Sequence, residues 1–129
     1  MGDRMLVEVS NTMRANVRQE FDIPFRYGGD EFLILLRGTA LSEATRIGER
    51  LNESVRNLSD GEISLSTGLL EVSPPCSMKI EEIVRWTVSL MYVAKRNGGN
   101  RIFAMTDAEG DPSLATDVGA DPAAKRRSA

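Results

Sequence analysis

Two carboxylates directly follow a pair of glycines in the stretch RYGGDEF, residues 26–32, and apolar residues flank this stretch on both sides. Adjacent residues of a strand point to opposite faces, so Asp30 and Glu31 do not belong to one solvated face. Carboxylate oxygens are ligands for hard divalent cations, and a glycine without Cβ lets a phosphate or sugar approach the backbone closely. The pattern therefore suggests a site for Mg²⁺ and a nucleotide, while a tight turn alone would also explain Gly28 and Gly29.

Lys95 is a second candidate, because it stands near the end of a predicted helix in the segment AKRNGGNR. Its ammonium group could bind a phosphate, and it could equally complement the negative end of the helix dipole. The phosphate-binding role requires that folding bring Lys95 close to the glycine–carboxylate hairpin.

The composition excludes several other kinds of chemistry. The 129 residues contain no His and one Cys, so a histidine base, a His-ligated zinc ion and an internal disulfide are excluded. A net charge of −3 disfavours nucleic acid as a partner. The longest apolar run, LILL, is far too short to cross a bilayer, and no signal peptide is recognisable. With its single cysteine, the chain is expected to be cytoplasmic and to have no membrane segment.

The spacing of the apolar residues predicts the order helix, β-hairpin, helix, strand, helix, strand. The expected elements cover residues 2–19, 25–27, 31–37, 40–58, 62–72, 77–97 and 101–105. Ser77 is the expected N-cap of the last helix. This order favours an α+β fold with a largely antiparallel sheet. From residue 106 the periodicity is lost, so we expect one domain over residues 1–105 and a disordered tail over residues 106–129.

The stretch RYGGDEF resembles the signature of GGDEF domains, the diguanylate cyclases. GDRML, SLSTGLLEV and MYVAKRNGGNRI are similar to further segments of that family and occur in the family's order, so the resemblance covers residues 2–105. It implies a palm-like fold, in which helices pack on a central antiparallel sheet. It also implies a reaction. Two domains, each holding GTP with Mg²⁺ or Mn²⁺, meet as a homodimer and form cyclic di-GMP and two pyrophosphates.

The resemblance also implies roles for individual residues. Asp30 and Glu31 would be metal ligands and catalytic residues, with Asp30 helping to deprotonate the attacking hydroxyl. Both glycines of the pair would lie against the bound nucleotide. Asp3 would read the guanine edge, since a carboxylate accepts hydrogen bonds from N1–H and N2–H₂ of that base. Lys95 would bind the triphosphate.

The sequence departs from the family pattern at its start. Family members usually begin with a strand and a helix that carry a further metal-binding Asp and a guanine-contacting Asn, and this chain starts after them. We therefore expect a partial domain that exposes a sheet edge and part of its core. We also expect a metal site with two carboxylates in place of three, which lowers its affinity for a hard cation.

A second departure concerns product inhibition. The family's Arg-x-x-Asp motif reads here as QEFD, so Asp22 is kept and Gln19 stands in place of the Arg. A Gln side chain cannot supply the charged bidentate fork that a phosphate or a guanine contact needs. We therefore expect a degenerate inhibitory site without tight product inhibition.

The sequence leaves two functions open. The chain is either a diguanylate cyclase domain or a degenerate, inactive GGDEF module that binds GTP or a protein partner. In the first case, a sensor domain upstream in the native gene would regulate it.

Overall fold

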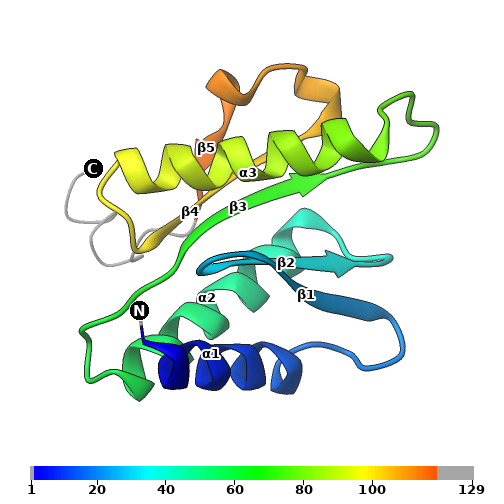
Figure 1. Ribbon diagram of the computed structural model, residues 1–129. Coiled ribbons are helices and arrows are strands. Elements are labelled where there is room, and N and C mark those ends of the chain that lie inside the picture. Colours follow the sequence, from blue (N-terminus) through cyan, green and yellow to red (C-terminus); the bar gives the residue numbers. More distant parts are fainter. Residues whose placement is uncertain (1, 119–129) are drawn as a thin grey trace.

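The computed structural model describes residues 2–118, which form an α+β fold, as the sequence predicts. The elements in chain order are α1 (Asp3–Ala15), β1 (Asp22–Gly28), β2 (Glu31–Leu36), α2 (Leu41–Leu58), β3 (Ser66–Glu71), α3 (Ile80–Arg96), β4 (Arg101–Thr106), two 3₁₀ turns (Asp107–Glu109 and Pro112–Leu114) and β5 (Thr116–Asp117). The helix α3 lies along β3 and β4, while α1 and α2 lie on the other side, beside the β1–β2 hairpin (Figure 1). Among the described residues, no helix is both long and apolar enough to span a bilayer.

The strands form two separate sheets. The β1–β2 hairpin is antiparallel, and Pro24 is tolerated because β1 is an edge strand that needs no second partner. In the other sheet, β3 and β4 are parallel because α3 connects them, and β5 is antiparallel to β4. The β3–β4–β5 sheet is therefore mixed, whereas the sequence predicts mainly antiparallel pairing.

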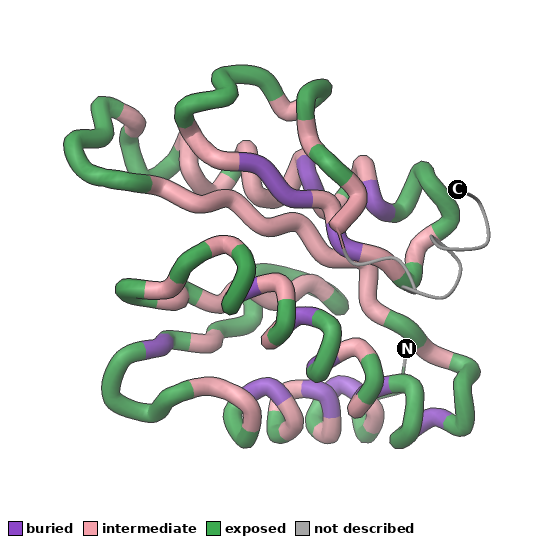
Figure 2. The backbone as a smooth tube through the Cα atoms, turned by 180° about the vertical axis from the view of Figure 1, so that it is seen from behind, coloured by how far each residue is buried: buried purple, intermediate pink, exposed green. Residues whose placement is uncertain are grey.

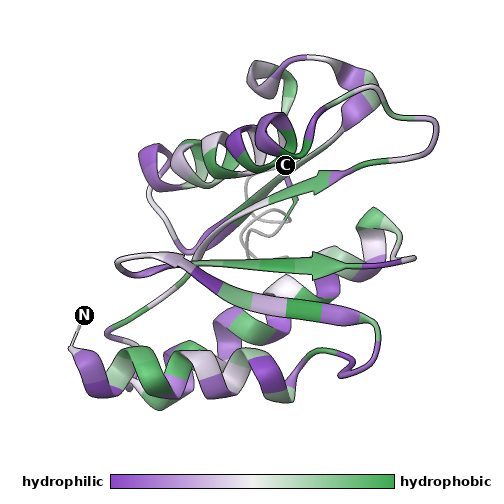
Figure 3. Cartoon of the chain, turned by 45° about the vertical axis from the view of Figure 1, so that its right-hand side comes forward, coloured by the Kyte–Doolittle hydropathy of each residue, from purple (hydrophilic) through white to green (hydrophobic). Residues whose placement is uncertain are grey.

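The inner edges of β2 and β3 have no strand partner among residues 2–118. The strand β3 is only half-buried along its whole length (Figure 2). The strand β2 is hydrophobic over most of its residues and also stays half-exposed (Figure 3). Two open strand edges and part of the apolar core thus border the space between the two sheets.

The core has two parts that follow the predicted apolar spacings. One cluster joins α1 to α2 through the buried residues Val9, Met13, Leu51 and Val55. The other lies where α3 packs on β3 and β4, with Leu90, Ala94, Ile102 and Met105 buried. These contacts fix α2 and α3, and with them the helical side chains of the candidate site.

Several ends of elements differ from the predicted ones because side chains bind backbone groups there. The strand expected from residue 62 begins at Ser66, since Ser59 Oγ accepts from Ile63 N–H at 2.9 Å and Asn52 Oδ1 from Leu65 N–H at 2.7 Å. The amide of Asn52 also donates to Asn100 Oδ1 at 2.6 Å, just before β4. The last long helix begins at Ile80, and Lys79 is its N-cap in place of the expected Ser77.

Residues 106–118 differ from the disordered tail that the sequence predicts. Asp111 Oδ1 accepts from Ser113 N–H at 2.9 Å and caps the second 3₁₀ turn. Arg101 and Asp117 form an ion pair at 3.3 Å, and Val118 N–H donates to Ile102 O at 2.9 Å. These local bonds need no apolar periodicity, so the pattern could not reveal them. The rest of the predicted tail, 119–129, lies outside the described residues.

Candidate functional site

Gly28 ends β1 and pairs with Glu31, so the turn of the β1–β2 hairpin consists of Gly29 and Asp30. A Cβ atom added at Gly28 or at Gly29 would meet no other atom within 4 Å, so packing does not require glycine there. Gly29 has a positive φ of 29°, which glycine adopts more readily than other residues. The guanidinium of Arg26 braces the turn through hydrogen bonds from Nε (2.8 Å) and Nη2 to the carbonyl of Gly29. The space beside both α-carbons is therefore open to a ligand, while Arg26 occupies the carbonyl of Gly29.

Asp30 lies in this turn and Glu31 begins β2, and both residues line a cavity of about 220 Å³ between the two sheets. The walls of the cavity come from β2, α2, the segment leading into β3, β3 itself and α3. Glu31 Oε1 accepts a hydrogen bond from the hydroxyl of Tyr92 on α3, at 3.1 Å. This bond and then the Glu31 charge raise the pKa of Tyr92 above its usual value, and the charge of Asp30 adds a smaller effect. Both carboxylates therefore act on the same point of α3.

Lys95 lies at this point as well. Its Nζ atom stands 5.2 Å from the centroid of the Tyr92 ring, and Lys95 lines the same cavity as the two carboxylates. Tyr92 and Lys95 are three positions apart on α3, so they share one face of the helix. The fold thus brings Lys95 to the hairpin, which is the condition that its phosphate-binding role requires.

Asp3 is exposed in the first turn of α1. Within the described part of the chain, Asp3 is not among the residues that line the cavity. Its predicted contact with guanine stays a prediction.

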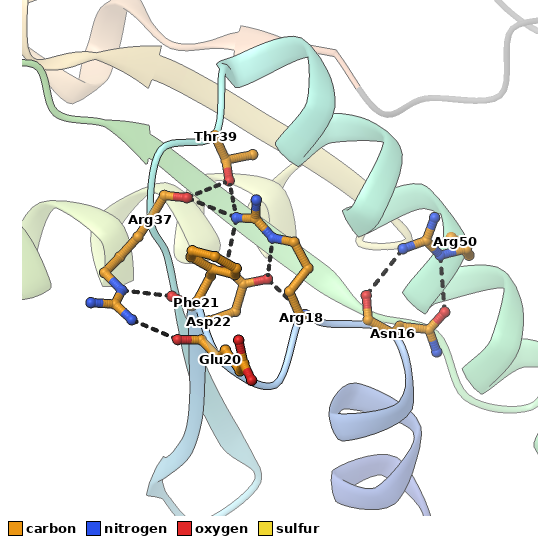
Figure 4. A network of polar contacts seen from close by, with 8 residues as sticks. All are labelled: Asn16, Arg18, Glu20, Phe21, Asp22, Arg37, Thr39 and Arg50. Carbon is orange, nitrogen blue, oxygen red and sulfur yellow. Dashed lines mark hydrogen bonds and ion pairs between the residues drawn. The ribbon is translucent and has the colours of Figure 1, made fainter.

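Asp22, one residue of the predicted degenerate inhibitory site, is bound by Arg18 (Figure 4). Asp22 is 4% exposed, and its carboxylate receives hydrogen bonds from Arg18 Nη2 (2.8 Å), Arg18 Nε (3.0 Å) and Arg18 N–H (2.8 Å). The hydrogen bond from Arg18 holds the pKa of Asp22 below its usual value. Gln19, the other residue of that site, is exposed.

The network around Asp22 also ties down both ends of the hairpin. Arg18 Nη2 donates to the carbonyl of Arg37 and to Thr39 Oγ1, each at 2.7 Å. Arg37 in turn donates to the carbonyls of Phe21 (2.7 Å) and Glu20 (2.8 Å). The sequence analysis missed Arg18, although its spacing of four residues from Asp22 could have indicated an ion pair. Asp22 therefore serves the structure of the hairpin base.

The residues present fit a metal ion that arrives with phosphate. No group of three or more His, Cys, Asp or Glu side chains in residues 2–118 is arranged to hold an ion alone. Mg²⁺ is commonly bound by one or two carboxylates together with substrate phosphates and water. Asp30 and Glu31 supply that number, and Lys95 adds a cation for the phosphates.

Comparisons with known proteins agree with this geometry. The family model described as "Diguanylate cyclase, GGDEF domain" matches residues 1–101. The chain is 35% identical over 108 residues to diguanylate cyclase DosC of Escherichia coli (strain K12), covering 78% of this chain and 23% of that protein. It is 32% identical over 107 residues to diguanylate cyclase A of Treponema denticola, covering 78% of this chain and 28% of that protein.

A third relative, the uncharacterized protein YtrP of Bacillus subtilis (strain 168), is 32% identical over 101 residues, covering 78% of this chain and 17% of that protein. The chain thus spans less than a third of the length of each of these curated relatives. Because the family model matches residues 1–101 of the 129, the chain belongs to the GGDEF family of diguanylate cyclase domains.

Proposed function

We propose that the chain is the nucleotide-binding part of a diguanylate cyclase, which condenses two GTP molecules into cyclic di-GMP and two pyrophosphates. The observation that carries this proposal is that Asp30, Glu31 and Lys95 line one cavity, beside two glycines with open space at their α-carbons. Carboxylates, open backbone and a lysine are the groups that a metal–triphosphate complex needs.

Each of these groups has a distinct task in the proposed reaction. Asp30 and Glu31 hold the cation, and Asp30 accepts the proton of the attacking 3′-hydroxyl. Lys95 binds the triphosphate and stabilises the charge that develops on the leaving pyrophosphate. Asp3 accepts hydrogen bonds from the guanine edge. Bound Mg²⁺ or Mn²⁺ would neutralise phosphate charge and favour ionisation of the hydroxyl.

The reaction also requires a second copy of the domain. Each site holds one GTP, and a cyclic dinucleotide needs two attacks, each between two different nucleotides in line with the bond that breaks. We therefore propose a homodimer in which two such sites face each other. Since the relatives are several times longer than this chain, we propose that a sensor region elsewhere in the native protein regulates this pairing, in the cytoplasm.

A second candidate function is an inactive module that binds GTP or a protein partner. Two observations favour it: residues 2–118 contain no group of three or more side chains placed to hold a metal ion, and the inner edges of β2 and β3 have no strand partner there. Incubation of the chain with GTP and Mg²⁺, followed by separation of the nucleotides, distinguishes the two functions. We expect little or no cyclic di-GMP from residues 1–129 alone. Robust turnover that Asp30→Ala abolishes would show that two carboxylates suffice.

The cyclase role of Glu31 is tested in a longer chain that begins with the first strand and helix of a family member. There we expect Glu31→Ala to lower the rate by at least about 100-fold, the scale for loss of a group that stabilises transition-state charge. Val7→Ala, a change of an exposed side chain on α1, is the control and should leave the rate unchanged. A rate for Glu31→Ala within a few fold of the parent would remove Glu31 from the proposed machinery.

A further inference from the structure

We infer that Tyr92 is a positioning residue, which holds the Glu31 carboxylate and the Lys95 ammonium in one arrangement for a metal–triphosphate ligand. This inference rests on the proposed function. Its basis is the pair of contacts that Tyr92 makes with two different elements, through its hydroxyl and through its ring.

The hydroxyl restricts the carboxylate. Glu31 has three rotatable side-chain bonds, and fixing such a side chain costs rotamer entropy when a ligand binds. The 3.1 Å hydrogen bond from Tyr92 to Oε1 already restricts this side chain before a ligand binds. Groups that hydrogen-bond to metal ligands fix the direction of those ligands in the same way.

The ring restricts the lysine. The ammonium of Lys95 lies 5.2 Å from the Tyr92 ring centroid, within the range of a cation–π contact. This contact keeps the positive charge on the side of α3 that faces the hairpin carboxylates. Tyr92 therefore contacts both Glu31, through its hydroxyl, and Lys95, through its ring.

Tyr92 also links the β1–β2 hairpin to α3, the helix that packs on the other sheet. Among the side-chain hydrogen bonds within residues 2–118, the Tyr92–Glu31 bond alone joins the β1–β2 hairpin to α3. If Tyr92 only stabilised the structure, its loss would weaken the binding of every ligand alike. If Tyr92 positions Glu31 through its hydroxyl and Lys95 through its ring, loss of the hydroxyl alone would weaken metal binding more than phosphate binding. This difference decides the design of the test.

The test uses the chain as it is and compares Tyr92→Phe with Tyr92→Leu. The control is Val7→Ala, since Val7 is exposed on α1 and is not among the residues that line the cavity. Binding of GTP is followed by NMR titration, first with Mn²⁺ at low concentration and then in EDTA. Line broadening of the amides around residue 31 reports the metal, and chemical-shift changes report metal-free GTP.

We expect Tyr92→Phe to weaken binding of Mn²⁺–GTP about tenfold, the lower end of effects from residues behind a metal ligand. Metal-free GTP should bind this variant within about twofold of the parent chain, because the ring under Lys95 is kept. Tyr92→Leu should weaken both kinds of binding, and Val7→Ala neither.

Two results would overturn the inference and leave the proposed function standing. One is a Tyr92→Phe variant that binds Mn²⁺–GTP as well as the parent does. The other is an equal loss of Mn²⁺–GTP and metal-free GTP in that variant, the result expected if Tyr92 only stabilised the structure. Absence of any binding by the parent chain would instead refute the proposed GTP site, and the inference with it.

Discussion

The Asp22 carboxylate is buried and bound to Arg18, so its charge contributes to the stability of the hairpin base. Its pKa is lowered in the folded state relative to an unfolded value of about 3.9. The stabilisation is therefore present above that unfolded value and is lost as the pH falls through the folded pKa. The sequence motif predicts that Asp22 belongs to a ligand site. A motif gives only the residue type, so it could not reveal that Arg18 binds the Asp22 carboxylate.

We expect Asp22→Asn to lower the free energy of unfolding by about 1–3 kcal/mol at pH 7, as for loss of a charged hydrogen bond. Urea unfolding at pH 7 and at pH 3 measures this, and the gap to the parent should shrink at the lower pH. Glu20→Gln is the control, because only the backbone carbonyl of Glu20 joins the network. An equal gap at both pH values would contradict the ionic role of Asp22.

A related expectation concerns the product, cyclic di-GMP. Asp22 is occupied by Arg18, and Gln19 carries no charge, so we expect no submicromolar binding at this place. Calorimetric titration of the chain with cyclic di-GMP measures this. Submicromolar affinity that disappears in Asp22→Ala would show that ligand can displace Arg18.

At the scale of elements, the distance between β3 and α3 is set by Gly68. A Cβ at this position would lie 2.5 Å from Met91 N, 2.6 Å from Leu90 Cβ and 2.6 Å from Thr87 O. Two of these atoms belong to the backbone of α3 and cannot rotate away. A side chain at residue 68 must therefore push α3 outward.

We expect Gly68→Ala to lower the free energy of unfolding by about 1–3 kcal/mol, the usual cost of overpacking. Urea unfolding of the variant against the parent measures it. Gly28→Ala is the matched control for stability, since open space surrounds that position. If both variants unfold alike, the contact between β3 and α3 is looser than these distances imply.

The sequence predicts the type of each main element because apolar periodicity and glycine or proline breaks act locally. It also predicts that Lys95 and the hairpin carboxylates belong to one site, through the family resemblance. The hydrogen bond from Tyr92 to Glu31 joins positions 61 residues apart, so no local pattern contains it. The start of β3 was predicted too early for a similar reason, because Asn52 on a distant helix binds the residues before it.

At the scale of the whole molecule, residues 2–118 form two sheets, and the facing edges of β2 and β3 have no strand partner there. An unpaired strand presents backbone donors and acceptors that a further strand can satisfy. The space between β2 and β3 belongs to the cavity that Asp30, Glu31 and Lys95 also line, and a strand added along these edges would stabilise the fold.

We expect that extension of the chain at its N-terminus with the first strand and helix of a family member raises the urea midpoint. Amide hydrogen exchange along β2 and β3 should slow several-fold, since these groups then gain partners. The control is the same extension with prolines at alternate positions of the strand, which removes its donors. Unchanged exchange in both strands would mean that the added segment docks elsewhere.

The amide of Asn52 has a consequence for the alignment of the second sheet. It accepts from the residue that precedes β3 and donates to the residue that precedes β4, and these strands pair from Ser66 with Arg101 onward. One side chain on α2 thus helps to fix the register between the two strands. A slip by one residue would turn every side chain of a strand to its other face. Loss of the Asn52 side chain would leave the helix and strand content intact and would shift the register between β3 and β4. Circular dichroism would not detect this change, whereas NMR would.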